Sequence, residues 1–230
     1  MIAHKKEFGV GFGMLISFVI VLVLIFLPLY NGQNGLNYLD SLYNSISKGS
    51  AYYIPHVREA VDEFLGKQVE VKVTAADAVQ ARQTALLFDK VGRDIRTETS
   101  KTDLTITGDL GKILNSCLAD ADLMYHNDGE KIRNIYSYDE RQVVYNWYNA
   151  LTGMEKDLKR QKKFKEAKIV AQVIQKAVEC SYNYYTIEPK RISDAPGIVT
   201  FSLVFYVIYT LWYGFAVMFM FEGWGMKLEH

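Results

Sequence analysis

Two long runs of apolar residues, 9–30 and 196–221, lie near the ends of the chain, and neither contains a charged residue. A helix rises about 1.5 Å per residue, so each run is long enough to cross the roughly 30 Å hydrocarbon core of a bilayer. We therefore predict two transmembrane helices. They divide the chain into a cytoplasmic N-terminus (1–8), a central domain (31–195), a cytoplasmic C-terminus (222–227) and a tag remnant (228–230).

Between the two runs, apolar residues recur mostly at spacings of three and four, which is typical of amphipathic helices. Two short stretches instead alternate apolar with polar residues, one around Val71 and one at Leu104 and Ile106. A predicted helix lies between them, and the polar run 96–102 is predicted to be a loop. The expected fold is a mainly α-helical domain with a small two-stranded βαβ element, and an all-helical domain is the alternative.

Basic residues near the spans indicate the orientation of the chain. Lys5 and Lys6 precede the first span, and no Lys or Arg follows it until Lys48. This asymmetry favours a cytoplasmic N-terminus, although Lys190 and Arg191 before the second span oppose it. We expect the central domain to be extracytoplasmic, on the cell (inner) membrane. The first span exceeds the length of a signal-peptide core, and no small-residue cleavage site follows it, so it is expected to be a retained anchor.

Small residues recur along one face of the first span, at Gly9, Gly13 and Ser17. Such a stripe lets another helix backbone approach closely within lipid. Gly214 of the second span lies at a similar depth to Gly13. These positions are interpreted either as the contact between the two helices of one chain or as a contact with a second copy.

Residues with hydroxyl groups occupy one predicted face of the second span: Ser202, Tyr206, Tyr209, Thr210 and Tyr213. In one interpretation this face packs against the first span. In the other, several copies of the chain bring these faces together to line a polar path across the membrane.

Catalytic motifs are not found in the sequence, which has no nucleophile elbow, phosphate-binding loop, HExxH or CxxC. We therefore expect neither an enzyme nor a cofactor. Asp122, His126 and Asp128 form a weak candidate for a Ca²⁺ site. Tyr125 stands where an EF-hand needs glycine, so the alternative is a polar helix end followed by a turn.

Two further sets of residues in the central domain have alternative interpretations. Cys117 and Cys180 are either a disulfide, if the compartment is oxidising, or two small buried hydrophobic residues. Eight aromatic residues are interpreted either as core or as the lining of a ligand pocket or partner surface. They are Tyr136, Tyr138, Tyr145, Trp147, Tyr148, Tyr182, Tyr184 and Tyr185.

The charges of the chain balance, with 26 basic and 26 acidic residues, which argues against nucleic acid as a partner. The expected partners are membrane lipid, further copies of the chain and another membrane protein. The leading hypothesis is a non-enzymatic, homo-oligomeric membrane subunit or scaffold that presents an interaction domain. The alternatives are an oligomeric channel or transport component, and an extracytoplasmic sensor that acts through a separate membrane protein.

Overall fold

A computed structural model of the protein describes residues 2–29 and 32–226. The chain forms two compact units. One contains the described residues up to Ser47 and from Pro189 onward, and the other is Lys48–Glu188, which we call the 48–188 domain. The predicted end of the first span at Tyr30 and the predicted tag remnant 228–230 lie outside the described residues.

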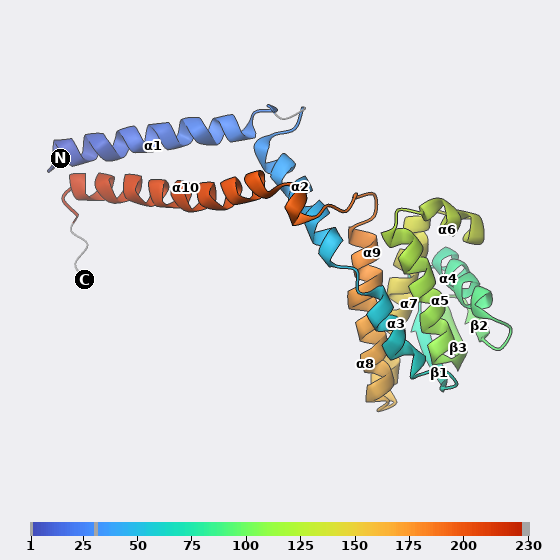
Figure 1. Cartoon of the computed structure of the whole chain (residues 1–230). Helices are drawn as coiled ribbons and strands as arrows, with labels where there is room; N and C mark the ends of the chain where they lie inside the picture. Colours follow the sequence, from blue (N-terminus) through green and yellow to red (C-terminus); the bar gives the residue numbers. More distant parts are fainter. Residues whose placement is uncertain (1, 30–31, 227–230) are drawn as a thin grey trace. The chain divides into compact units, whose positions relative to one another are not determined.

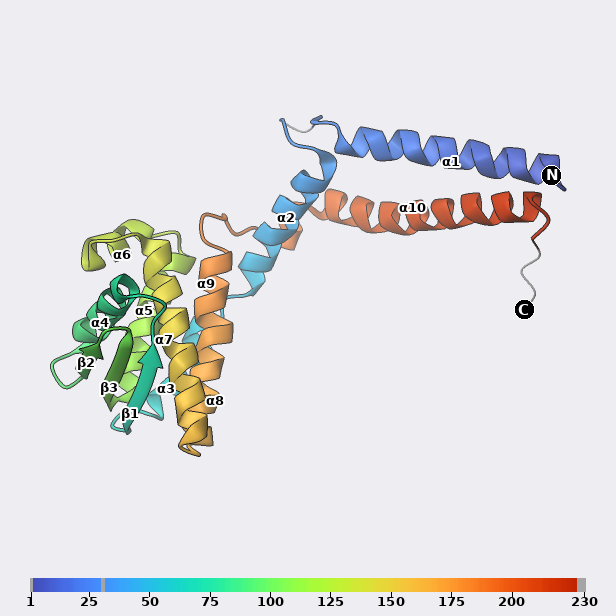
Figure 2. The ribbon, with the colours of Figure 1, turned by 180° about the vertical axis from the view of Figure 1, so that it is seen from behind.

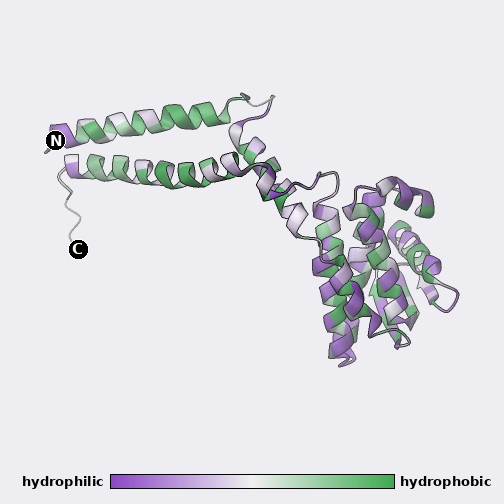
Figure 3. Ribbon diagram, viewed as in Figure 1, coloured by the Kyte–Doolittle hydropathy of each residue, from purple (hydrophilic) through white to green (hydrophobic). Residues whose placement is uncertain are grey.

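Among the described residues, two helices are long and apolar enough to cross a membrane: α1 (Lys5–Phe26) and α10 (Pro196–Gly223) (Figures 1 and 3). Only 6% of the most apolar window of each helix is buried within the protein. The helices therefore differ from the core helices of a globular domain, which are mostly buried. Helix α1 begins four residues earlier than predicted and ends two residues before Pro28, because the residue before a proline disfavours helical geometry.

Helices α1 and α10 pack against each other in antiparallel directions along a repeat of seven residues. The contact positions include Gly11 and Phe18 on α1 and Tyr209, Ala216 and Gly223 on α10. A spacing of seven is that of helices that pack at a shallow crossing angle. A Cβ on Gly11 would lie 2.7 Å from the backbone nitrogen of Met220, so this crossing requires glycine.

Helix α2 (Gly35–Ser50) belongs mainly to the same unit as α1 and α10. The Tyr43 hydroxyl lies 2.6 Å from the Ser202 hydroxyl on α10. The Ser45 carbonyl accepts a hydrogen bond from the Lys190 amide, which precedes the 3-10 turn η2 (Ile192–Asp194). These contacts link α2 to both ends of the segment that leads into α10.

The 48–188 domain is mostly helical and has one small sheet (Figures 1 and 2). Its helices are α3 (Ile54–Asp62), α4 (Ala78–Val91), α5 (Leu110–Tyr125), α6 (Gly129–Tyr136), α7 (Glu140–Arg160), α8 (Phe164–Val173) and α9 (Glu179–Asn183). Helix α5 is central, because residues on most of its circumference are buried. A π-helical turn, η1 (Ile174–Val178), lies between α8 and α9.

The sheet within the described chain has three antiparallel strands, in the order β1 (Gln68–Thr74), β3 (Asp103–Asp109) and β2 (Arg96–Ser100). The predicted βαβ element is therefore wrong, since such a unit requires parallel strands. The run 96–102 is also not a loop. Strand β2 lacks apolar alternation because it is an exposed edge strand, and it joins β3 through a tight hairpin in which Lys101 has a φ of 57°.

One face of the sheet is buried by its alternating apolar side chains. Val69, Val71 and Val73 of β1 point into the core together with Leu104 and Ile106 of β3. Helix α7 packs closely on β1 because Gly153 has no side chain, and a Cβ there would lie 2.9 Å from Val73. A groove lies beside the free edge of β1, and residues of β1 and α7 form its two sides.

Candidate functional site

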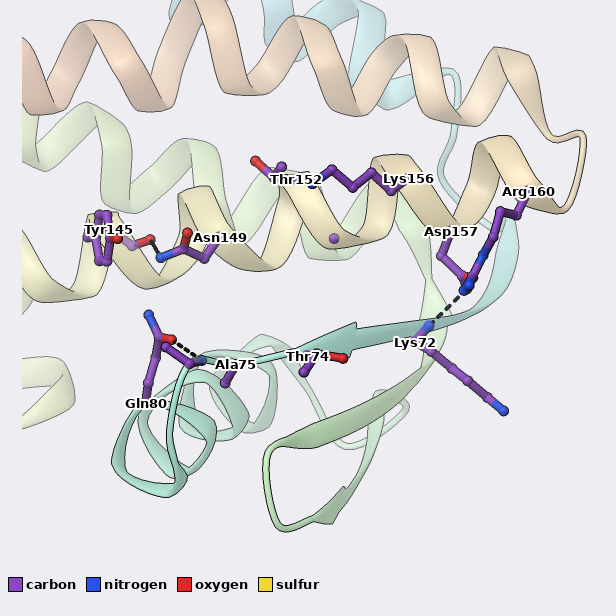
Figure 4. A pocket seen from close by; sticks show the side chains of 12 residues that line it. Lys72, Thr74, Ala75, Gln80, Tyr145, Asn149, Thr152, Lys156, Asp157 and Arg160 are labelled. Atoms are coloured by element: carbon purple, nitrogen blue, oxygen red, sulfur yellow. Dashed lines mark hydrogen bonds and ion pairs between the residues drawn. The ribbon is translucent and has the colours of Figure 1, made fainter.

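A groove of the 48–188 domain runs between β1 and α7 and has a volume of about 670 Å³ (Figure 4). It is lined by Lys72, Thr74, Ala75 and Ala76 with Gln80 of α4, and by the α7 residues Tyr145, Asn149, Thr152, Gly153, Lys156, Asp157 and Arg160. We call it the α7 groove.

The polar side chains reach the α7 groove because of the two-residue alternation of β1 and the three- to four-residue repeat of α7. In β1 the odd-numbered valines point into the core, so Lys72 and Thr74 lie on the outer side of the strand. In α7, residues three and four apart fall on one side of the helix, which gathers Tyr145, Asn149 and Lys156 along the groove. The alternation of β1 and the helical repeat of α7 are both visible in the sequence, but their proximity depends on the fold.

The free edge of β1 is partly covered by side chains from the end of α7. The Lys72 amide donates to Asp157 Oδ2 at 2.9 Å, and Gln161 Nε2 donates to the Glu70 carbonyl at 2.7 Å. Arg160 also pairs with Asp157. Burial opposes the charge of Asp157, but the hydrogen bonds from Arg160, Lys72 and Gln161 prevail and lower its pKa. The α7 side chains thus satisfy backbone groups that an edge strand leaves open.

The groove is polar and has more positive than negative charge. Its lining includes three basic residues, Lys72, Lys156 and Arg160, and one carboxylate, Asp157, which is already hydrogen-bonded. Figure 4 shows Lys156 extended along α7 toward Thr152, while the side chain of Lys72 points away from the helix. Ammonium and amide donors in this arrangement suit a carboxylate or another polar acceptor. The lining contains neither histidine nor cysteine.

The predicted Ca²⁺ candidates do not converge. Asp122 accepts a hydrogen bond from the Tyr52 hydroxyl at 2.7 Å, and its Oδ1 lies 3.3 Å from Nδ1 of His126. Asp128 pairs with Lys131 instead. Within the described residues, no three His, Cys, Asp or Glu side chains are grouped so that they could hold a metal ion. Burial and the carboxylate of Asp122 raise the pKa of Tyr52 to about 12.

The predicted aromatic set divides between core and surface. Tyr136 and Trp147 are buried and both donate to Oδ2 of Asp120, at 2.6 and 2.7 Å. Burial raises the pKa of Asp120, and the two hydrogen bonds only partly offset it. Tyr145 and Tyr182 are exposed, and Tyr148 is half-buried. The sequence gives no sign that Asp120, rather than Asp122, is the carboxylate that meets the aromatic residues.

A buried lysine holds together the two ends of the 48–188 domain. Lys48 is only 1% exposed, and its Nζ donates to the carbonyls of Tyr184 (3.1 Å) and Ile187 (2.6 Å) and to Oδ1 of Asn127 (3.0 Å). Burial lowers its pKa, and the charge of Glu188 partly opposes this. Sequence reasoning missed this site. The available signal is the spacing of three that places Lys48 on the same buried face as Leu42 and Ser45.

The two cysteines are free thiols in the structure. Cys117 is fully buried in α5, and burial raises its pKa well above the ordinary value. Cys180 is half-buried, and its Sγ lies 3.5 Å from the Gln175 carbonyl. The structure therefore places both as separate apolar side chains and contains no bond between them.

The small residues singled out in the apolar helices do not form the contact between α1 and α10. A Cβ built on Gly9, Gly13 or Gly214 would meet no atom within 4 Å, and Ser17 bonds the carbonyls of its own helix. The interpretation in which Gly13 and Gly214 pack this helix pair is therefore wrong, because Gly11 fills that role. A contact of Gly9, Gly13 and Ser17 with a second copy stays a prediction.

The predicted hydroxyl face of α10 is split by the helix pair. Ser202 is buried beside Tyr43, and the ring of Tyr209 stacks on Phe18 with centroids 4.2 Å apart. Tyr206, Thr210 and Tyr213 are exposed. The ring of Tyr213 also contacts Phe18, with centroids 5.1 Å apart, although much of this side chain is exposed. Three of the five predicted pore-lining residues thus make contacts within the chain.

Comparison with known proteins gave no match: no family model, no curated protein and no solved structure is similar to this chain. Its function must therefore be argued from its own residues and geometry.

Proposed function

We propose that the protein is a non-enzymatic membrane subunit or scaffold that presents the 48–188 domain outside the cytoplasm and binds a partner through the α7 groove. The observation that supports this most is the exposure of α1 and α10. Both helices are strongly apolar, yet only 6% of each apolar window is covered by the protein.

Exposed apolar area on this scale is unfavourable in water, at about 25 cal/mol for each Å². A bilayer removes this cost, because lipid covers the outer faces while the two helices pack along Gly11, Phe18 and Tyr209. The fold thus supports an anchor made of a helix pair rather than of two independent helices.

The expected partner of the domain is a protein segment that carries carboxylates. The α7 groove offers Lys72, Lys156 and Arg160 together with the amide of Asn149. Its volume of about 670 Å³ is sufficient for several side chains, and its open, polar character suits a peptide surface better than an enclosed small molecule.

Self-association is the second part of the proposal. Gly9 and Gly13 lie on the face of α1 that α10 leaves uncovered, where the backbone of a helix from another copy can approach. The channel alternative instead uses Tyr206, Thr210 and Tyr213, whose exposed side chains would line a path between copies. Ion flux through liposomes that contain the purified protein favours that alternative.

The anchor is tested with the full chain expressed in cells. We expect the protein to remain in the membrane fraction after extraction at high salt and at alkaline pH. We also expect protease added from outside to digest the 48–188 domain only after the outer barrier is opened. Release into the soluble fraction contradicts the anchor, and digestion only after the inner membrane is broken contradicts the orientation.

A further inference from the structure

A second, smaller pocket lies on the 48–188 domain between α7 and the η1–α9 segment, and its volume is about 280 Å³. It is lined by Tyr145, Tyr148, Tyr182, Glu179, Asn183 and two valines. The buried valines, Val144 and Val178, form an apolar floor. We call this site the tyrosine pocket. It shares one lining residue, Tyr145, with the α7 groove.

The π-helical turn places two of the lining residues. A π turn holds one residue more than an α turn, so the residues after it are rotated by about 100° relative to a continuous α-helix. Glu179 follows directly after η1, and Tyr182 is one further turn along the same face. The irregular turn thereby directs a carboxylate and a phenol ring toward Tyr145 and Tyr148 of α7.

The polar groups of the pocket have no partners within the protein. Glu179 is half-buried, and its carboxylate has no hydrogen bond or ion pair with any residue that the structure describes. The same is true of the hydroxyl groups of Tyr145, Tyr148 and Tyr182. A carboxylate beside apolar groups attracts an opposite charge more strongly than one in open water. This site contains none, which points to a cation supplied by a ligand.

We propose that the tyrosine pocket binds a quaternary ammonium group. Such a cation is attracted to the faces of aromatic rings and, being weakly hydrated, loses little when it leaves water. Glu179 supplies the opposite charge at the pocket wall. A volume of about 280 Å³ is at the small end of ligand pockets, so it suits a trimethylammonium head rather than a large cofactor.

A quaternary ammonium group can come from two kinds of ligand. One is a small soluble compound such as choline, and the other is the headgroup of a choline phospholipid. The experiments below separate the two sources.

Binding is measured by calorimetry on the full-length protein in maltoside micelles, which contain no ammonium group. The probes are choline, tetramethylammonium and the uncharged tert-butyl isostere of choline. We expect saturable binding of both cations, with Kd at least about tenfold lower than that of the isostere, because only the cations gain the ring and carboxylate interactions. Equal affinity for choline and its isostere, or no saturable binding of choline, overturns the proposal.

Two substitutions test the residues. Glu179→Gln removes the charge with little change of shape, and Tyr182→Leu removes an exposed ring that the core does not require. Each is expected to raise Kd for choline about fivefold or more. The matched controls are Glu63→Gln and Phe164→Leu, which alter an exposed carboxylate and an exposed ring outside the pocket and should leave Kd unchanged. Circular dichroism confirms that the variants are folded. Choline binding that neither pocket substitution weakens places the ligand elsewhere and overturns the assignment.

Nanodiscs distinguish the sources. A headgroup ligand makes choline bind more weakly in discs of choline phospholipid than in discs of phosphatidylglycerol, because the lipid competes. A soluble ligand gives the same Kd in both discs. Each result supports the pocket and identifies its source, whereas the loss of choline binding in phosphatidylglycerol discs contradicts it.

Discussion

Asp120 and Lys48 are buried in the 48–188 domain without an ion-pair partner, and they stabilise different parts of it. Asp120 lies among aromatic rings at the centre, where Tyr136 and Trp147 donate to it. Lys48 lies at the edge, where it binds main-chain carbonyls of residues 184 and 187. Each gains hydrogen bonds but loses hydration, so both are expected to make stability depend on pH.

Two substitutions of Asp120 distinguish the contribution of its hydrogen bonds to stability from that of its charge. Asp120→Ala leaves two buried donors unsatisfied, and we expect a loss of about 2–5 kcal/mol in the free energy of unfolding. Asp120→Asn keeps an acceptor and is expected to cost less. Thermal unfolding of the full chain in micelles, followed by near-ultraviolet circular dichroism, measures both. Equal losses in the two variants would show that the hydrogen bonds do not determine the effect.

The pH dependence of Asp120→Asn has a defined sign. The raised pKa of Asp120 means that the folded protein binds this proton more tightly than the unfolded chain. Wild-type stability therefore falls as the pH rises from the ordinary value of 3.8 toward the raised value. The variant lacks this loss, so its Tm relative to wild type should increase across that window and then level off. A difference in Tm that is constant with pH contradicts the prediction.

Replacement of Lys48 tests the junction of the domain ends. Lys48→Met fills the same space but leaves three acceptors without their donor, so we expect a loss of about 2 kcal/mol or more at neutral pH. The lowered pKa of Lys48 means that wild-type stability rises as the pH increases toward 10.5, so the loss should grow under alkaline conditions. Lys162→Met, at an exposed lysine in the α7–α8 turn, is the matched control. Equal stability of the two variants would contradict the role of Lys48.

At the scale of elements, the helices were largely predictable and the sheet was not. The apolar repeat of α5 and α7 and the valine alternation of β1 are explicit in the sequence. Strand β2 has the sequence RTETS, in which no apolar residue marks a buried face, so only its pairing with β3 defines it. The groove and the tyrosine pocket depend on which elements become neighbours, and local patterns do not contain that information.

The edge of β1 provides a prediction about acid stability. Asp157→Ala removes the acceptor of the Lys72 amide and the partner of Arg160. The lowered pKa of Asp157 means that its contribution is present above the ordinary aspartate value and is lost as the pH falls through the lowered value. We therefore expect the variant to be about 1–3 kcal/mol less stable near neutral pH and to converge with wild type in acid. Denaturation at several pH values checks this, and parallel curves would contradict it.

The contact between α1 and α10 can be tested with two matched substitutions on α1. Gly11→Leu places a side chain where a Cβ already lies 2.7 Å from the α10 backbone, whereas Gly13→Leu enters open space. We expect Gly11→Leu to abolish cross-linking between cysteines placed at Phe18 and Tyr209, and Gly13→Leu to leave it intact. Loss of cross-linking in both variants would contradict the packing.

The same pair tests self-association. If a second copy docks on the open face of α1, Gly13→Leu should lower the mass of the complex measured by light scattering, because the added side chain blocks close approach. Wild type that is monomeric in micelles contradicts this part of the proposal and leaves the helix pair unaffected.

At the scale of the whole molecule, length and hydropathy predicted the two apolar helices to within four residues at each described end. That prediction succeeded because a run of more than 20 uncharged residues is a strong physical signal. The boundary between the two compact units was harder to predict from the sequence. The predicted domain 31–195 is longer than the 48–188 domain, because α2 is an ordinary amphipathic helix by sequence and only its contacts with Ser202 and Lys190 assign it to the other unit.

The bond from Lys48 Nζ to the Ile187 carbonyl, at 2.6 Å, brings the start of the 48–188 domain next to its end. A folding unit that begins and ends at one spot behaves as a cassette. We expect that the 48–188 domain can be inserted into a surface turn of an unrelated protein without distorting the backbone of either protein. We also expect it to tolerate new termini elsewhere, for instance in the 162–163 turn, once a short linker joins its original ends.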